Sequence, residues 1–153
     1  AFNTDSVISD DLIDLRVASH PIRLLSNAAE HLRLPQPLVA PASALPKAVR
    51  TSLEGKEIRD YGLGVAQGEF RFSEKCCVLP SPMTVAYALA LSASGGAARI
   101  ELAGFDGYPT GDPRNTEVDE FLIEYRDAAQ TPEILAVTPT RYSVSARSVY
   151  SAI

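Results

Sequence analysis

Short apolar runs alternate with longer stretches of helical periodicity along this chain. Residues 37–41 form one such run, bounded by prolines, and predict a short strand. Residues 61–65 fit either an edge strand or a loop, and the segment 55–71 around them, rich in glycine and mixed charge, has no clear pattern. The strongest strand predictions are residues 12–18, 75–79, 100–105 and 134–138.

Helical patterns fill most of the intervening chain. The His20-Pro21 step ends the first strand, because a residue before proline avoids the helical region, and residues 22–32 then predict a helix. Residues 45–53 predict a weak helix or turn, and residues 145–152 predict a short terminal helix.

The two strongest helices carry start signals. Ser81 is the expected N-cap, and Pro82 the first residue, of a helix that ends at Ser94 and is apolar nearly all round, as a helix covered by a sheet would be. A second helix begins with Asp112 as its cap and Pro113 at its first position. The apolar stripe of this helix consists of Val118, Phe121, Leu122 and Tyr125.

This alternation predicts the architecture. Strands and helices that alternate across short connections form a mostly parallel sheet with helices on both faces. The 153 residues, 46% hydrophobic and 22% charged, match one compact domain, so we expect a single α/β domain over residues 1–153. Because the chain does not begin with methionine, we expect either a removed initiator or a piece of a longer chain.

Charge and cysteine content narrow the expected partners. With 14 Lys and Arg against 19 Asp and Glu, the net charge of -5 gives no electrostatic reason to expect nucleic acid or an anionic membrane. No run approaches the roughly 20 apolar residues needed for membrane insertion, and the first residues lack a signal-peptide pattern. The adjacent Cys76 and Cys77 lie in an apolar run, so we expect buried free thiols and a reducing cytoplasm.

The candidate ligand site lies where the strand predicted at residues 100–105 ends in a small-residue loop. In an open α/β sheet, ligands bind outside the carboxyl ends of the strands. The start of the helix that ends at Ser94 is expected at the same edge, where a helix N-terminus favours an anion. The expected ligand-binding residues are Ser81, Thr84, Asp106, Gly107, Tyr108 and Thr140.

Several of these residues also have structural explanations. The Asp106 carboxylate could instead accept hydrogen bonds from the amides of its own loop, and capping alone would explain Ser81. Asp112 is expected to be structural. Arg141 and Tyr142 follow the last strong strand and could bind a carboxylate or phosphate, although a solvated arginine is more common.

Other chemistry is limited. His20 lies beside a proline turn at a strand end and is the acid/base candidate, since the unperturbed pKa of histidine lies near neutrality. His31 is expected on the surface of a helix. No metal-ligand spacing, P-loop, G-x-S-x-G or complete G-x-G-x-x-G motif occurs, so we expect no metal and no cofactor.

Two segments resemble known proteins. Residues 85–91 are VAYALAL, a Gly95-Gly96 break follows, and residues 99–108 are RIELAGFDGY. Roughly residues 80–140 resemble the C-terminal Rossmann-like domain of HMG-CoA lyase-like aldolase proteins from bacterial surface-polysaccharide clusters. They are more distantly similar to 6-hydroxymethylpterin pyrophosphokinase-like and motility accessory factor proteins, and to small bacterial sialyltransferases that bind a CMP-sugar.

The resemblance implies a three-layer Rossmann-like fold that lacks the first Gly-rich βα unit, because the opening residues resemble the end of the strand after that loop. It also implies that Ser81, Thr84, Asp106 and Tyr108 face a nucleotide sugar or acidic sugar. The activity would then be glycosyltransferase-like, or the chain would serve an upstream aldolase-like domain in polysaccharide biosynthesis. The missing loop favours the alternative of a non-catalytic module for homodimerisation or domain docking, with no ligand.

Overall fold

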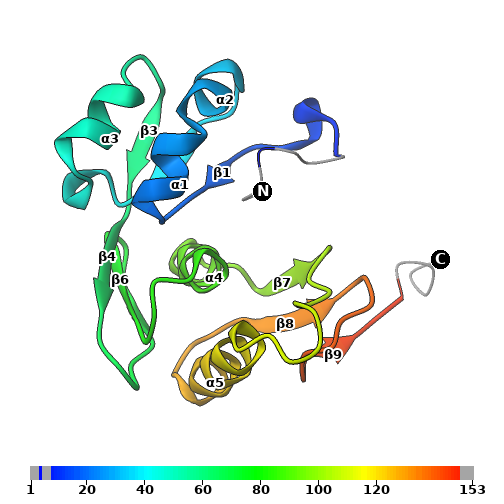
Figure 1. The fold of residues 1–153 in the computed structure, drawn as a ribbon. Helices are drawn as coiled ribbons and strands as arrows, with labels where there is room; N and C mark the ends of the chain where they lie inside the picture. The colour runs from blue at the N-terminus through cyan, green and yellow to red at the C-terminus, as the bar shows by residue number, and fades with distance from the viewer. Residues whose placement is uncertain (1–3, 5–7, 149–153) are drawn as a thin grey trace.

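The computed structural model describes residue 4 and residues 8–148, and Figure 1 shows the arrangement of their elements. The helical elements are η1 (Asp10–Leu12), α1 (Pro21–Ser26), α2 (Ala28–Arg33), η2 (Ala42–Ala44), α3 (Lys47–Ser52), α4 (Thr84–Ser94) and α5 (Arg114–Asp127), where η denotes a 3-10 helix. The strands are β1 (Arg16–Val17), β2 (Leu38–Ala40), β3 (Ile58–Asp60), β4 (Gly62–Val65), β5 (Arg71–Phe72), β6 (Cys76–Leu79), β7 (Arg99–Leu102), β8 (Glu133–Ala136) and β9 (Ser145–Ala146). The protein therefore has the mixed α/β composition that the sequence predicts.

The described strands form three three-stranded sheets rather than the single sheet expected. The sheets β1-β2-β3 and β7-β8-β9 are parallel throughout. In the sheet β4-β6-β5, β4 is parallel and β5 antiparallel to β6. The four strongest strand predictions are confirmed as β1, β6, β7 and β8, although β1 is only two residues long and the four are distributed over all three sheets.

The first two sheets are separate because one extended segment changes its pairing partner at Tyr61. Before this residue β3 pairs with β2, and the N–H of Tyr61 still donates to the Ala40 carbonyl over 3.1 Å. At the next residue, the N–H of Gly62 donates to the Lys75 carbonyl over 2.8 Å, and β4 then pairs with β6. Of the two alternatives for residues 61–65, an edge strand or a loop, the structure shows the edge strand, β4.

Two hydrophobic clusters lie under these sheets. The smaller one joins α1 and α3 to β2 through Leu24, Val49 and Leu38. The larger one contains Tyr87 of α4 and Phe121 of α5, and Figure 1 shows α4 between the sheet β4-β6-β5 and β7. The predicted apolar stripe of α5 is confirmed as part of this larger cluster, since Val118, Phe121, Leu122 and Tyr125 are all buried. Helix α5 joins the parallel neighbours β7 and β8.

Three predicted elements differ from the structure. The helix expected at residues 22–32 is divided at Asn27 into α1 and α2. Only Arg16–Val17 of the strand expected at residues 12–18 pairs in a sheet. The terminal helix expected at residues 145–152 is wrong at its start, because Ser145–Ala146 pairs with β8 as β9; residues 149–152 lie outside the described part.

The two cysteines are both free, but only one is buried. Successive side chains of a strand point to opposite faces, so Cys77 of β6 enters the larger cluster while Cys76 faces solvent. Burial, with a smaller contribution from Cys76, raises the pKa of the Cys77 thiol to about 12. The expectation that Cys76 is buried is therefore wrong.

Within residues 8–148, none of the helices combines the length and apolar character that crossing a bilayer requires.

Candidate functional site

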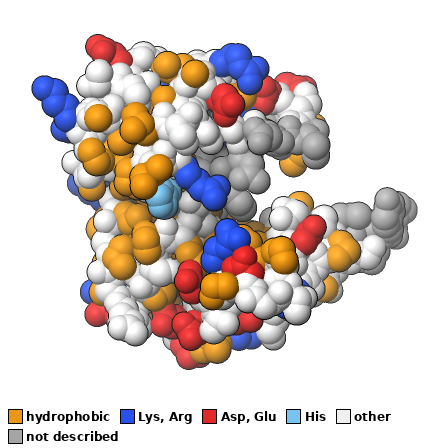
Figure 2. Space-filling model, viewed as in Figure 1, with side chains coloured by type: hydrophobic (Ala, Val, Ile, Leu, Met, Phe, Trp, Pro, Cys, Tyr) orange, Lys and Arg blue, Asp and Glu red, His pale blue; other side chains and the backbone are white. Residues whose placement is uncertain are grey.

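A cleft of about 600 Å³ opens where three segments meet, each following a different strand. These strands are β1, β6 and β7, one from each sheet. Figure 2 shows a histidine next to Lys or Arg side chains on the hollowed face of the molecule. The cleft is lined by Ala18, His20, Arg23, Asn27 and His31 after β1; by Pro82, Met83, Thr84 and Val85 after β6; by Gly104, Phe105, Asp106, Gly107 and Tyr108 after β7; and by Thr4, Arg114, Val118 and Tyr142.

The structure brings five of the candidate residues to this one cleft: Thr84, Asp106, Gly107, Tyr108 and His20. They arrive there because each lies between the carboxyl end of a strand and the next helix, or begins that helix, which is where ligand sites form in α/β proteins. The other two candidates, Ser81 and Thr140, are not among the lining residues.

Ser81 is not the N-cap of α4, contrary to expectation. The N–H of Met83 donates to the Ser81 carbonyl over 2.8 Å, and this tight turn delays the helix, so that Met83 becomes the N-cap and Thr84 the first helical residue. The Ser81 hydroxyl is buried without a hydrogen-bond partner in the described part of the chain. Thr140 stabilises a turn instead, since its Oγ1 accepts the N–H of Tyr142 over 3.2 Å.

The loop that carries Asp106 and Tyr108 is fixed by Asn115, a buried residue of α5. Asn115 Oδ1 accepts the Tyr108 N–H and the Tyr142 hydroxyl, each over 3.0 Å. Its Nδ2 donates to the carbonyls of Tyr108 at 3.3 Å and Pro109 at 3.1 Å. These four bonds use the full capacity of the amide, and Asn115 therefore positions the loop.

Arg141 holds the same loop from the other side. Its backbone N–H donates to the Asp106 carbonyl over 3.1 Å, and its guanidinium donates to the Tyr108 carbonyl over 2.6 Å. Gly107 has a φ of 107°, and a Cβ at this position would lie 2.2 Å from Cδ of Arg141. Only glycine fits under the arginine, so Gly107 and Arg141 together set the shape of the loop.

The loop presents one carboxylate and one aromatic ring. The Asp106 carboxylate is exposed, and no hydrogen bond or ion pair joins it to another described residue, so it does not cap its own loop amides. Tyr108 is 38% exposed, and the Arg114 guanidinium carbon lies 3.9 Å from the centroid of its ring. Asp112 pairs with Arg114 at 2.6 Å and accepts its backbone N–H, so Asp112 is structural, as expected; these bonds lower the pKa of its carboxyl to about 2.

The start of α4 forms the middle of the cleft. Thr84 and Val85 line it, and Thr84 Oγ1 shares a hydrogen bond of 3.1 Å with the hydroxyl of the buried Ser19, which follows β1. Met83 supplies no side-chain cap. The first amides of a helix lack intrahelical acceptors, so this end of α4 presents hydrogen-bond donors at the cleft.

Helices α1 and α2 form the opposite wall, and here the sequence prediction missed most of the site. Arg23 and Asn27 were not among the candidates. His31, expected on the surface, is only 5% exposed and lines the cleft, because its face of α2 turns away from solvent. Burial lowers the pKa of His31, nearby Lys56 and Arg16 lower it further, and Glu30 opposes them.

No group of three or more His, Cys, Asp or Glu side chains within residues 8–148 is placed to hold a metal ion.

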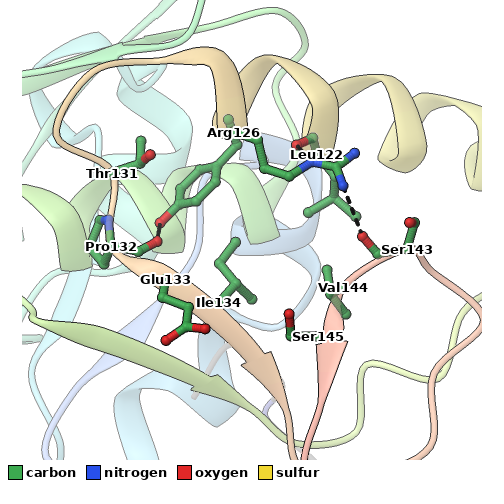
Figure 3. A pocket seen from close by; sticks show the side chains of 10 residues that line it. Leu122, Arg126, Thr131, Pro132, Glu133, Ile134, Ser143, Val144 and Ser145 are labelled. Carbon is green, nitrogen blue, oxygen red and sulfur yellow. Dashed lines mark hydrogen bonds between the residues drawn. The ribbon is translucent and has the colours of Figure 1, made fainter.

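A second cavity of about 540 Å³ lies between α5, β8 and β9, and Figure 3 shows its lining. Two of its polar side chains already bond within the lining: the Tyr125 hydroxyl donates to the Pro132 carbonyl over 2.8 Å, and Arg126 donates to the carbonyls of Leu122 and Ser143. It contains none of the candidate residues. The cleft beyond the strand ends is therefore the better candidate for a ligand site.

Comparisons of the chain with protein-family models, with curated proteins and with solved structures find no match.

Proposed function

We propose that this domain binds a small acidic ligand, a nucleotide sugar or an acidic sugar, in the cleft beyond β1, β6 and β7. The observation that supports this most is the convergence of Asp106, Tyr108, Thr84 and basic side chains of α1 and α5 on one cavity. Its volume of about 600 Å³ falls in the range of small-molecule sites.

The residues have distinct roles in this proposal. The unpaired Asp106 carboxylate accepts hydrogen bonds from ligand hydroxyls, which is the chemistry of a sugar ring. The Tyr108 ring packs on a base or sugar face. The first amides of α4, near Thr84, face the negative group, and the exposed His20 is the acid/base candidate.

The fold assignment in this proposal is Rossmann-like. Two of the three sheets are wholly parallel, and helices connect β1 to β2 and β7 to β8, which is the unit from which such folds are built. The resemblance of roughly residues 80–140 to aldolase-associated Rossmann-like domains suggests a role in bacterial surface-polysaccharide biosynthesis. A reducing cytoplasm would keep the exposed Cys76 thiol free.

The alternative is a docking or dimerisation module. It is favoured by exposed apolar side chains in the first part of the chain, where Leu12 of η1 is 73% and Ile22 of α1 71% exposed. The braced loop and the unpaired Asp106 carboxylate favour ligand binding instead, because neither is needed for an apolar contact.

The test is calorimetric titration of CMP-N-acetylneuraminic acid, UDP-N-acetylglucosamine and free N-acetylneuraminic acid into the wild-type protein and an Asp106→Asn variant. We expect Asp106→Asn to weaken binding by about 1.5–3 kcal/mol, the usual range for hydrogen bonds to a charged group, without changing thermal stability. Asp127→Asn, at the end of α5 and outside the cleft, removes the same charge and is the control. Failure of the wild-type protein to bind any of the three compounds would favour the docking module.

A further inference from the structure

The cleft wall formed by α1 and α2 carries a row of nitrogen-bearing side chains. His20, Arg23, Asn27 and His31 are spaced three, four and four residues apart and all line the cleft. This spacing places residues on one face of a helix. Although the helix is divided at Asn27, the face continues, because the Asn27 N–H donates to the Arg23 carbonyl and the His31 N–H to the Asn27 carbonyl, each over 3.0 Å.

The row has donors in excess and no carboxylate. The Arg23 guanidinium is exposed and makes no hydrogen bond or ion pair to another described residue. His31 is nine-tenths buried at the cleft, and its Nδ1 has no partner within the described residues. A buried polar atom without a partner is costly, and a hydrogen bond to a ligand in the cleft would remove that cost.

We propose that His20, Arg23, Asn27 and His31 form the subsite for the phosphate groups of the ligand, so that the domain selects phosphate-bearing sugars over free acidic sugars. This inference rests on the proposed function of the cleft and assigns one part of the ligand to each wall. The sugar hydroxyls lie at Asp106, and the phosphates lie along α1 and α2. From His20 to His31 the face extends about 16 Å at 1.5 Å per residue. The single carboxylate of a free acidic sugar would contact only a fraction of this length. A sugar nucleotide is longer, because its phosphates lie between two rings, and it can contact more of the face.

The arrangement of charges supports placing the phosphates along α1 and α2. Arg114, on the far wall, is already paired with Asp112 and stacked on Tyr108, so Arg23 is the cleft arginine with an uncommitted guanidinium among the described residues. His31 meets the ligand as a neutral hydrogen-bonding group at neutral pH, since burial lowers its pKa and Lys56 and Arg16 add to this effect against Glu30.

The experiment compares Arg23→Gln with Arg33→Gln in the full chain. Both residues belong to the same helical pair and both are exposed, but only Arg23 lines the cleft, so the two variants have equal net charge and differ in the subsite. The probes are UDP-N-acetylglucosamine, CMP-N-acetylneuraminic acid and free N-acetylneuraminic acid, measured by calorimetry with each variant and with Asn27→Ala.

We expect the two phosphate-bearing probes to bind the wild-type protein at least tenfold more tightly than free N-acetylneuraminic acid. Arg23→Gln should weaken their binding about tenfold or more, the effect of losing a charge-assisted hydrogen bond. Asn27→Ala should weaken it severalfold, and Arg33→Gln should change it less than twofold. The affinity of the wild-type protein should fall with added salt more steeply than that of Arg23→Gln.

Two results would overturn the subsite and leave the proposed function intact: equal binding by Arg23→Gln and Arg33→Gln, or binding of free N-acetylneuraminic acid as tight as that of the phosphate-bearing probes. In both cases the cleft still binds a ligand and Asp106→Asn still weakens it. If the wild-type protein binds none of the probes, the proposed function and the subsite both fail.

Discussion

The two walls of the cleft are built differently. The loop wall, residues 104–108, is fixed by bonds from outside the loop: Asn115 and Arg141 bond to its backbone, and the Gly104 N–H donates to Thr138 Oγ1 over 2.9 Å. On the helix wall, formed by α1 and α2, the Arg23 guanidinium and the Nδ1 of His31 by contrast have no partners within the described residues. The loop wall therefore supplies a preset geometry, and the helix wall supplies charge that a ligand can engage. Preorganised groups lower the entropic cost of binding, whereas groups without a partner in the free protein can form new hydrogen bonds or ion pairs with the ligand.

The largest expected effect on stability and affinity comes from removing the Asn115 side chain that holds the loop wall. Asn115→Ala removes four hydrogen bonds and leaves the Tyr108 N–H without its acceptor, although the carbonyls of Tyr108 and Pro109 keep the donors Arg141 and Asp112. We expect the free energy of unfolding to fall by about 1–3 kcal/mol, measured by urea denaturation, and the affinity for nucleotide sugars to fall more than in Asp106→Asn. Asn115→Asp keeps the Oδ1 acceptor and should fall between the wild type and Asn115→Ala. Unchanged stability and affinity in Asn115→Ala would show that Asn115 does not hold the loop.

Gly107→Ala tests the shape of the loop. The new Cβ would meet the Arg141 side chain at 2.2 Å in a backbone with φ of 107°, so either the loop or the Arg141 side chain must shift and their contact is disturbed. Backbone strain alone costs about 1–3 kcal/mol. Gly111→Ala is the matched control, because Gly111 also has a positive φ of 85° but no atom lies within 4 Å of its added Cβ. We expect the two variants to lose similar thermal stability, because both place an alanine at a positive φ. Ligand binding, measured by titration, should be weaker only in Gly107→Ala. Equal binding by the two variants would contradict the role of the Gly107–Arg141 contact.

The helix wall should be sensitive to pH. Since burial, with Lys56 and Arg16, lowers the pKa of His31 below its usual 6.5 in the folded protein while Glu30 opposes the shift, the unfolded chain takes up a proton first as the pH falls. The stability that His31 contributes is therefore complete above pH 6.5 and is lost as the pH falls from 6.5 toward the lower folded-state pKa. His31→Gln should flatten this part of the stability curve in urea titrations. A curve of the same slope in His31→Gln and the wild type would rule out this source of pH dependence.

The sequence predicts the loop wall better than the helix wall. Asp106, Gly107 and Tyr108 follow a recognisable strand directly, so local pattern and the strand-end rule suffice to place them. The local pattern does not identify Asn115 and Arg141, because they hold the loop from positions 7 and 33 residues away from Tyr108 along the chain. The signal for the helix wall was present, since Arg23, Asn27 and His31 recur every four residues in a predicted helix. Whether that face meets solvent or a cleft depends on tertiary packing, which periodicity does not determine.

The same distinction holds for the fold. The strands at residues 75–79, 100–105 and 134–138 and the buried stripe of α5 follow from hydrophobic periodicity. Their division among three sheets depends on which neighbour each short strand pairs with, and the change of partner at Tyr61 has no marker in the local sequence. Ser145–Ala146 likewise becomes a strand because β8 offers it an edge.

The most direct test of the central claim, that both walls belong to one ligand site, is a two-dimensional NMR titration of the wild-type protein with UDP-N-acetylglucosamine and CMP-N-acetylneuraminic acid. We expect the backbone amides of Arg23, Asn27 and His31 and those of Gly104, Asp106, Gly107 and Tyr108 to shift together along one saturation curve for at least one of the two compounds. Shifts confined to one wall, shifts around Arg126 and Ser143 in the second cavity, or no shifts at all would contradict the account.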